Sequence, residues 1–325
     1  MKIRVLLTGG TIGSAVKNGA ISPFGSPAEK LEADYRRRGG RAELDFVSPF
    51  TILSEDLCAD DLNMLTESVR RACESGFEKL IICHGTDTLQ YSAAAVLYAL
   101  AGKRCTAVFV SAAKPLESSE TNGFENFCAA AAFLENTDMP GVFAAYQNAG
   151  QPARILPAAR LALHPEGGDA LHCLNGACAA VYQSGKIYSD PSYLPAQSRS
   201  LDFPVRFETF SGIEVVTAVP GSAYAPCGKK IRAVLFKPYH SGTLHTAGAA
   251  FRAFCQNAKS RGIPLFAADI LPGAQYATSL AFADLGIIPL EGAAFAATYI
   301  KIWLAAGKSG AELETFVKTS YAGEI

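Results

Sequence analysis

Two short segments of the sequence combine threonine hydroxyls with glycine. Thr8–Gly13 reads Thr-Gly-Gly-Thr-Ile-Gly, and His84–Thr88 reads His-Gly-Thr-Asp-Thr. A hydroxyl becomes a useful nucleophile only when a neighbouring group accepts its proton, and the second segment also carries the carboxylate of Asp87. Glycine lets backbone N–H groups approach a ligand closely. Together the two segments predict one shared site for a small ligand.

Each segment directly follows a short apolar run that we expect to be a β-strand, at residues 3–7 and 79–83. In open α/β sheets, ligands bind outside the carboxyl ends of the strands, which is where both segments would lie. A structural alternative stands beside this interpretation. Thr-Gly-Gly-Thr alone is compatible with a tight turn, and Thr86 or Asp87 is a candidate N-cap of the helix that follows.

Several other kinds of site are excluded by the same residues. A dinucleotide fingerprint would require glycine where Thr8 stands, and the chain has no complete Gly-x-x-x-x-Gly-Lys-Ser/Thr phosphate loop. His240 and His245 have no cysteine or carboxylate partners at metal-ligand spacing, so we expect no metal site.

The nine cysteines are scattered and include no Cys-x-x-Cys pair. An odd, unpatterned set within apolar runs is typical of buried free thiols in a reducing compartment. The first residues lack the apolar core and cleavage site of a signal peptide, and no stretch of 18 uninterrupted apolar residues predicts a membrane span. We therefore expect a cytoplasmic protein that does not enter a membrane.

Length and charge limit the class of protein further. A chain of 325 residues with 49% hydrophobic and 18% charged residues predicts a globular protein of two domains. Its formal net charge of -1 argues against a surface for nucleic acid or anionic membrane. The one dense basic cluster, Arg36 to Arg38, is more typical of a solvated helix end than of a phosphate site.

The remaining pattern predicts an α/β fold in which a larger N-terminal domain, residues 1–185, contains a mostly parallel sheet covered on both faces. Residues 186–211 are rich in Pro, Ser and Tyr and predict a linker, and residues 212–325 predict a smaller C-terminal α/β domain. The expected strands are 3–7, 79–83, 105–110, 213–217, 231–236 and 264–268, and the expected helices are 57–75, 89–100, 124–134, 247–260, 274–285 and 293–305. The regular alternation of strand and helix breaks after Gly150.

The chain strongly resembles the bacterial-type L-asparaginase family of asparaginases and glutaminases. Thr8–Ile12 and His84–Thr88 match the family's two threonine motifs in order and spacing. Further similarities cover nearly the whole chain, and those in the second half point to the cytosolic type I branch. They are Ile52–Leu57, Ser111–Pro115, Tyr239–Thr243 and Gly262–Pro264. The resemblance implies the family's two-domain α/β fold, with a larger and a smaller domain.

The resemblance also implies roles for individual residues. Thr11 would be the nucleophile that attacks a side-chain amide carbon, with Thr86 as the second catalytic threonine and Asp87 as its carboxylate neighbour. Asp87 would in addition bind the α-ammonium group of the substrate. The expected catalytic residues are thus Thr11, Thr86 and Asp87. The expected substrate-binding residues are Gly10, Ser54, Glu55, Gly85, Thr86, Asp87 and Ala112, with backbone N–H groups near Thr86 and Ala112 stabilising the oxyanion.

Two parts of the family pattern have no counterpart here. The family activates its second threonine with a lysine, but Arg154–Ala158 contains none, and the nearby Arg160 stays charged at any useful pH. The family also has a tyrosine on a lid after the first motif, and Gly19–Phe24 contains none. Glu55 stands where the secreted branch has an amide.

The resemblance thus implies hydrolysis of L-asparagine to L-aspartate and ammonia, without a cofactor, by a homodimer or homotetramer. Two alternatives remain open: a non-catalytic relative that binds an amino acid, and an amidase for another small amide. A tRNA-linked amidotransferase is less favoured, because the sequence shows neither an added domain nor a basic face. An ammonia-release assay over several small amides would separate these functions.

Overall fold

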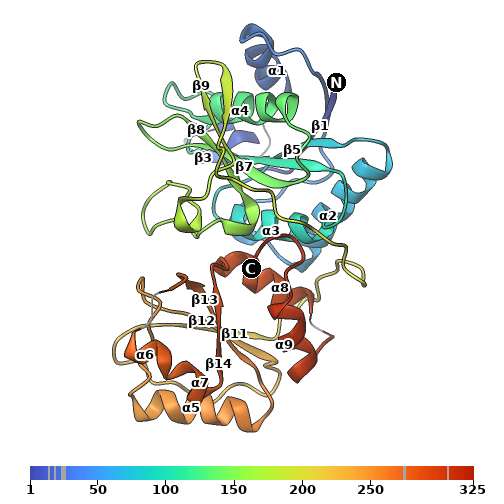
Figure 1. The fold of residues 1–325 in the computed structure, drawn as a ribbon. Helices are drawn as coiled ribbons and strands as arrows, with labels where there is room; N and C mark the ends of the chain where they lie inside the picture. The colour runs from blue at the N-terminus through green and yellow to red at the C-terminus, as the bar shows by residue number, and fades with distance from the viewer. Residues whose placement is uncertain (14, 18–19, 23–26, 274–275, 306) are drawn as a thin grey trace. The chain divides into compact units, whose positions relative to one another are not determined.

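The computed structural model describes residues 1–13, 15–17, 20–22, 27–273, 276–305 and 307–325. These residues form two compact units (Figure 1). Unit 1 comprises Met1–Val205 together with Tyr321–Gly323, and unit 2 comprises Arg206–Ser320 with Glu324–Ile325. Each unit has its own sheet and its own hydrophobic core, so each is described separately.

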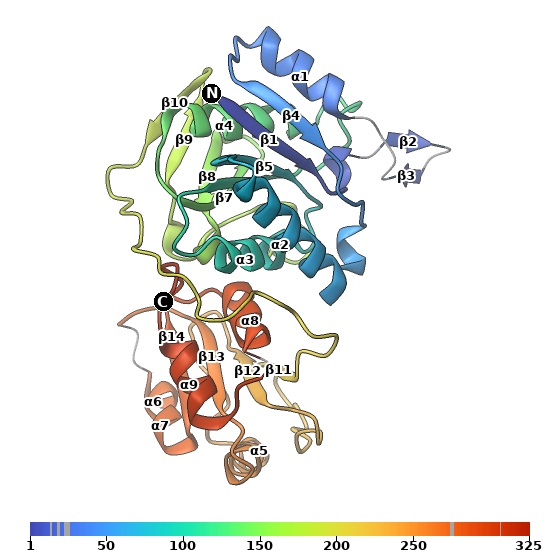
Figure 2. The same cartoon turned by 90° about the vertical axis from the view of Figure 1, so that its right-hand side faces the viewer.

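Unit 1 is built on an eight-stranded sheet with the order β10-β9-β8-β7-β6-β5-β1-β4 (Figure 2). The strands from β4 to β7 in this order are parallel, whereas β8, β9 and β10 are each antiparallel to their neighbours. The strand bounds are β1 Lys2–Leu7, β4 Glu43–Val47, β5 Lys79–Cys83, β6 Thr106–Val110, β7 Gly141–Gln147, β8 Ala153–Pro157, β9 Ala180–Gln183 and β10 Lys186–Ser189. A separate two-stranded ribbon is formed by β2 Ala15–Lys17 and β3 Ala20–Ser22.

Helices cover both faces of this sheet (Figure 2). On one face, Leu31 of α1 (Pro27–Arg37) and Phe127 of α4 (Gly123–Asn136) pack against alternate strand residues such as Ile81. On the other face, α2 (Ala59–Glu74) and α3 (Leu89–Ala99) pack against the remaining strand residues, among them Ile82. Because β5 and β6 are buried on both faces, their sequences are continuous apolar runs.

Unit 2 contains a four-stranded parallel sheet with the order β11-β12-β13-β14. The strand bounds are β11 Ile213–Thr217, β12 Ala233–Lys237, β13 Leu265–Ile270 and β14 Ile287–Glu291. The helices are α5 Ala249–Ser260, α6 Ala277–Leu280, α7 Phe282–Leu285, α8 Phe295–Leu304 and α9 Gly310–Lys318. Its core joins Phe251 and Phe254 of α5 to Phe236 of β12.

The α/β fold with a larger, mostly parallel sheet and a smaller second sheet is confirmed. The alternation of strand and helix also ends after β7, because β8, β9 and β10 follow one another without an α-helix between them. The segment expected as a linker from residue 186 begins with β10, which is the last strand of the larger sheet. Where one helix was expected at 274–285, α6 and α7 are two short helices, and residues 274–275 lie outside the described part.

The elements expected from the sequence did not include α1, β4, the strands β7 to β10, β14 or α9. For α1 and β4 the apolar pattern is weak, because α1 carries mainly charged residues and β4 is a half-buried edge strand. Within the described residues, the helices are too short or too polar for any of them to cross a membrane.

Candidate active site

The first threonine of the Thr8–Gly13 segment has a structural role. The fully buried Thr8 donates hydrogen bonds from its N–H and its hydroxyl to the carbonyl of Cys83, at 3.1 and 2.8 Å. Its own carbonyl accepts a hydrogen bond of 3.0 Å from the N–H of Ile52. These bonds fix the end of β1 between β5 and the segment at residue 52. They leave Thr11, which begins a short 3-10 helix and is partly exposed, as the available hydroxyl of this segment.

Glycine is required at two positions where the segments meet. Gly10 has a φ of +78°, and a Cβ atom built on it would lie 2.2 Å from the backbone nitrogen of Gly85. A Cβ atom on Gly85 would lie 2.4 Å from the Oγ of Ser54. Real Cβ atoms do not approach other atoms so closely, so a side chain at either position would push the segments apart. The two threonine motifs and Ser54 therefore lie in direct contact.

Ser54 and Asp87 connect the second motif to the short 3-10 helix Ser54–Asp56. The Ser54 hydroxyl donates a hydrogen bond of 3.1 Å to the Oδ2 atom of Asp87. The Thr88 hydroxyl donates one of 2.8 Å to the Ser54 carbonyl. Ser54 is buried, while Asp87 and the neighbouring Glu55 are exposed. Two carboxylates are thus accessible beside a buried hydroxyl.

Thr86 is partly exposed and stands three residues before α3. Its carbonyl accepts a hydrogen bond of 3.2 Å from the N–H of Leu89, the first residue of the helix. The N-cap position itself is Thr88 and not Thr86 or Asp87. The structural alternative of a capping role for those two residues is therefore wrong.

His164 is a neighbour of Thr86 that the sequence analysis did not single out. Its Nε2 atom lies 3.2 Å from the Thr86 carbonyl, and its Nδ1 atom lies 2.9 Å from the Ala170 carbonyl. A neutral imidazole has one N–H, so only the doubly protonated ring donates to both carbonyls at once. The contact joins residues 78 positions apart, and no local pattern around His164 predicts it.

His84 of the second motif is buried, with 1% of its surface exposed. Its Nδ1 atom lies 2.8 Å from the Gly85 carbonyl, and its ring meets the Phe109 ring edge-on. Burial lowers the pKa of His84, and this effect exceeds the opposing one of the hydrogen bond to Gly85. The neutral ring is therefore a packing element beneath the loop.

The end of β6 is held rigidly by two asparagine side chains of the α4 region. Asn122 accepts a hydrogen bond of 2.9 Å from the N–H of Ala113, and Asn126 donates one of 2.8 Å to the carbonyl of Ser111. Both asparagines also bond to the backbone of Gln147 at the end of β7. The buried Ala112 lies between these anchored residues, just after β6, which is the strand next to β5.

Taken together, the structure brings Gly10, Gly85, Ser54 and Asp87 into contact at the carboxyl edge of the sheet. Thr11, Thr86 and Glu55 are chain neighbours of these four, and Ala112 lies at the end of the adjacent strand. The segment Gly19–Phe24, where a lid tyrosine was sought, lies outside the residues whose side chains are described.

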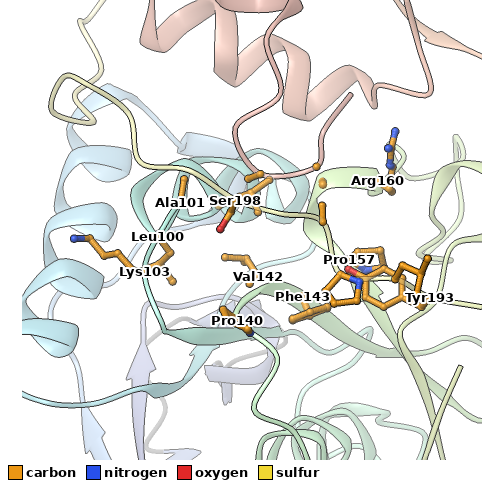
Figure 3. A pocket seen from close by; sticks show the side chains of 18 residues that line it. Leu100, Ala101, Lys103, Pro140, Val142, Phe143, Pro157, Arg160, Tyr193 and Ser198 are labelled. Carbon is orange, nitrogen blue, oxygen red and sulfur yellow. The ribbon is translucent and has the colours of Figure 1, made fainter. Parts of the chain in front are cut away.

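The segment that lacks the expected lysine lies elsewhere in unit 1. Pro157 pairs with Phe143, near the start of β7, and both line a cavity of about 130 Å³ (Figure 3). Tyr193 packs edge-on against Phe143 at its wall. None of the residues expected in the catalytic site lines this cavity. The cavity is therefore distinct from the candidate active site.

No metal-binding cluster accompanies these features. Within the part of the chain that the structure describes, no three or more His, Cys, Asp or Glu side chains are grouped so that they could hold a metal ion. The polar groups gathered around Ser54 and Asp87 are hydroxyls, carboxylates and backbone groups. Such a set suits recognition of a small polar molecule and attack by a hydroxyl.

Comparison with known proteins identifies related sequences and folds. The family model described as "Asparaginase, N-terminal" matches residues 2–189, which is more than half of the chain. A solved L-asparaginase from Thermococcus kodakarensis superimposes with a TM-score of 0.82 at 20% identity, covering 100% of this chain and 99% of that one. A Campylobacter jejuni structure described as "Probable Cytoplasmic L-asparaginase" gives a TM-score of 0.76 at 17% identity, covering 98% and 99%. At these identities the likeness shows the fold.

A curated relative is more similar in sequence over a shorter region. This relative, a glutamyl-tRNA(Gln) amidotransferase subunit from Metallosphaera sedula, is 35% identical over 104 residues. The match covers 30% of this chain and 23% of the relative. The chain therefore corresponds to less than a quarter of that relative's length.

Proposed function

The chain belongs to the asparaginase family, and from that premise we propose that it hydrolyses L-asparagine to L-aspartate and ammonia, with Thr11 as the nucleophile. The observation that carries the proposal is the convergence of Gly10, Gly85, Ser54 and Asp87 at the carboxyl edge of one parallel sheet. All four were expected site residues, and they come from three separate segments of the chain.

The proposed reaction has two stages. The Thr11 hydroxyl attacks the side-chain amide carbon while a base accepts its proton, and the amide nitrogen leaves as ammonia with a returned proton. Water then hydrolyses the ester formed on Thr11, which releases the new carboxylate and restores the hydroxyl. Backbone N–H groups near Thr86 and Ala112 stabilise the negative oxygen of each tetrahedral intermediate.

Substrate recognition rests on charge. Asp87 pairs with the α-ammonium group, and Glu55 adds a second exposed carboxylate nearby. Ser54 donates its hydroxyl proton to Asp87, which fixes the orientation of that carboxylate. Because one hydroxyl donates to one acceptor at a time, a substrate α-carboxylate at Ser54 would compete with Asp87 for this proton.

His164 acts as a positioning residue in this proposal. Its Nε2 atom holds the carbonyl of Thr86, so that the position of the second threonine depends on the chain segment that carries His164. The missing lysine leaves Thr86 without the family's usual base, and we expect weak turnover for that reason. A general base usually contributes about 10² to 10⁴-fold to a rate.

The direct experiment measures ammonia release by the purified protein from L-asparagine, L-glutamine, D-asparagine and an N-acylated asparagine. We expect activity on L-asparagine that is lost in Thr11→Ala. Thr315→Ala, which changes an exposed threonine of α9 in unit 2, is the matched control and should retain activity. Activity that survives in Thr11→Ala would refute the assignment of Thr11 as the nucleophile. Ammonia release from one of the other amides, but not from L-asparagine, would show that the substrate is a different amide.

The curated relative favours a second candidate function, in which this chain is one component of an amidotransferase. The sequence match to that relative supports it, whereas the net charge of -1 shows no excess of basic residues of the kind that usually binds a nucleic acid. Ammonia release from a free amino acid amide by this chain alone favours the hydrolase. No release from any amide, together with binding of aspartate, would instead favour a non-catalytic amino-acid-binding relative.

Association and location complete the proposal. Large apolar side chains are exposed within each unit, for example Leu194 at 81% in unit 1 and Leu280 at 62% in unit 2. Such residues are available to an interface between protomers, and we propose a cytoplasmic homodimer or homotetramer, as the family resemblance implies, that buries more than about 2,000 Å². The nine free cysteines and the cytoplasmic protein among the similar structures support that location. Light scattering that reports a monomer at micromolar concentration would refute the association.

A further inference from the structure

Two cysteine sulfur atoms lie in contact within unit 1. Cys73 belongs to the last turn of α2, and Cys105 directly precedes β6. The Cys105 thiol donates a hydrogen bond to the sulfur of Cys73, and the two sulfur atoms are 2.7 Å apart. The sulfur atoms of a disulfide are about 2.05 Å apart, so closing the remaining gap needs only a small movement. We propose that Cys73 and Cys105 form a reversible disulfide by exchange with a low-molecular-weight disulfide.

The contact changes the acidity of both thiols. When Cys105 loses its proton, the Cys73 thiol can donate a hydrogen bond to the resulting thiolate, and this bond lowers the pKa of Cys105. The pKa of Cys73 is raised, first by the same shared hydrogen and then by burial. Lys103 lowers the pKa of both thiols, whereas Glu74 raises that of Cys73 and Glu78 that of Cys105. One thiol of the pair, that of Cys105, therefore ionises more readily than an ordinary buried thiol.

Other cysteines of this unit are in a different environment. Cys83 and Cys128 are buried, and burial raises the pKa of each to about 12. Both side chains are shielded from a small disulfide in solution, so they react slowly. Cys73 is half-buried and is thus accessible to a small disulfide, whereas Cys105 lies behind it with 6% of its surface exposed.

The exchange balances without any further reagent. The sulfur of Cys73 attacks one sulfur of the small disulfide R–S–S–R, its proton passes to the Cys105 thiolate, and one RS⁻ leaves. That RS⁻ removes the proton from Cys105 and departs as RSH. The Cys105 thiolate then attacks Cys73 in the mixed disulfide and expels the second RS⁻. The pair is oxidised by two electrons, and R–S–S–R is reduced to two thiol groups.

The new bond would connect two elements across a closed loop of the chain. Cys73 and Cys105 are 32 positions apart, and the chain between them contains β5, the His84–Thr88 segment and α3. Closing such a loop restricts the unfolded chain and stabilises the folded one. For a chain of this size the melting temperature should rise by about 5 to 10 °C. This effect does not depend on the proposed function.

The test uses the full chain carrying Cys58→Ser, because Cys58 is exposed and would react independently. The protein is incubated with oxidised glutathione, and its thiols are counted after denaturation. The nine cysteines less Cys58 leave eight thiols, and the disulfide should reduce these to six. Peptide mapping should show Cys73 joined to Cys105, and a dithiol reductant should restore eight thiols and the original melting temperature.

The Cys105→Ser variant in the same background provides the matched control. It should retain glutathione on Cys73 as a mixed disulfide, because the second thiol is missing, and its melting temperature should not rise on oxidation. The number of thiols in the parent protein, which carries Cys58→Ser alone, is decisive even if Cys105→Ser folds poorly. Eight thiols remaining after oxidation, or Cys73 recovered only as a glutathione adduct in the parent, would overturn the proposal.

Discussion

Ser54 and Asp87 lie 33 positions apart in the sequence, yet the Ser54 hydroxyl donates a hydrogen bond of 3.1 Å to the Asp87 carboxylate. Ser54 is buried and Asp87 is exposed. The hydrogen bond therefore reaches Asp87 from the interior of the protein, and the solvent-facing side of the Asp87 carboxylate stays accessible. The same serine is in contact with Gly85 and receives a hydrogen bond from Thr88. One buried residue thus orders the whole second motif.

Replacing Ser54 by alanine should weaken substrate binding more than turnover. A hydrogen bond to a charged group contributes about 1.5 to 3 kcal/mol, which corresponds to roughly 10 to 100-fold in KM. Steady-state ammonia release over a range of L-asparagine concentrations separates KM from kcat. Ser68→Ala, at a partly exposed serine whose hydroxyl donates to the Met64 carbonyl within α2, should leave both unchanged. An unaltered KM in Ser54→Ala would contradict the assigned role.

Gly10→Ala should destabilise the protein far more than Gly39→Ala. Both glycines have positive φ values, +78° and +87°, so both substitutions carry the backbone strain of about 1 to 2 kcal/mol. Only at Gly10 does the added Cβ meet backbone atoms, those of Gly85, since the space around Gly39 is open. Urea unfolding of both variants measures the difference. Equal losses of stability would show that the two motifs are not in contact.

His164→Ala should lower kcat for L-asparagine by about 10-fold with little change in KM, because Thr86 loses a hydrogen-bonding partner at its carbonyl. His164→Asn retains a donor and should recover part of the lost rate. The exposed His172→Ala serves as the control and should behave like wild type. A rate unaffected in His164→Ala, or one that falls equally in all three variants, would remove His164 from the site.

The buried His84 should make stability depend on pH. Burial lowers its pKa in the folded protein, while an unfolded histidine has a pKa of about 6.5. Between these two values the unfolded chain binds the extra proton, so the free energy of unfolding falls as pH falls below about 6.5. The slope from one such group is at most about 1.4 kcal/mol per pH unit.

Urea unfolding at several pH values between 7.5 and 5, on both sides of the ordinary histidine pKa of about 6.5, measures this slope. His84→Asn should reduce it, because asparagine does not titrate and retains a donor for the Gly85 carbonyl. The exposed His172→Asn should leave the slope as it is in wild type. A His84→Asn protein with the full wild-type slope would assign the pH dependence to other groups.

The sequence determined the fold class and the position of the two threonine motifs. Strands such as β5 are buried on both faces and therefore read as continuous apolar runs, which can be recognised locally. A residue that directly follows such a strand must lie at its carboxyl end, so Gly10 and Gly85 could be placed at one edge. Elements with a weak apolar pattern, such as α1 and β4, were not predicted, because burial on one side leaves a less distinct pattern.

Only the tertiary structure decided which distant side chains meet. The bond from Ser54 to Asp87, the contact of His164 with Thr86 and the pair of Cys73 and Cys105 join residues 33, 78 and 32 positions apart. Such contacts depend on strand order and on how each helix packs against the sheet. Many arrangements share the same local apolar pattern, and only the packing of complete elements selects the one that brings these atoms together.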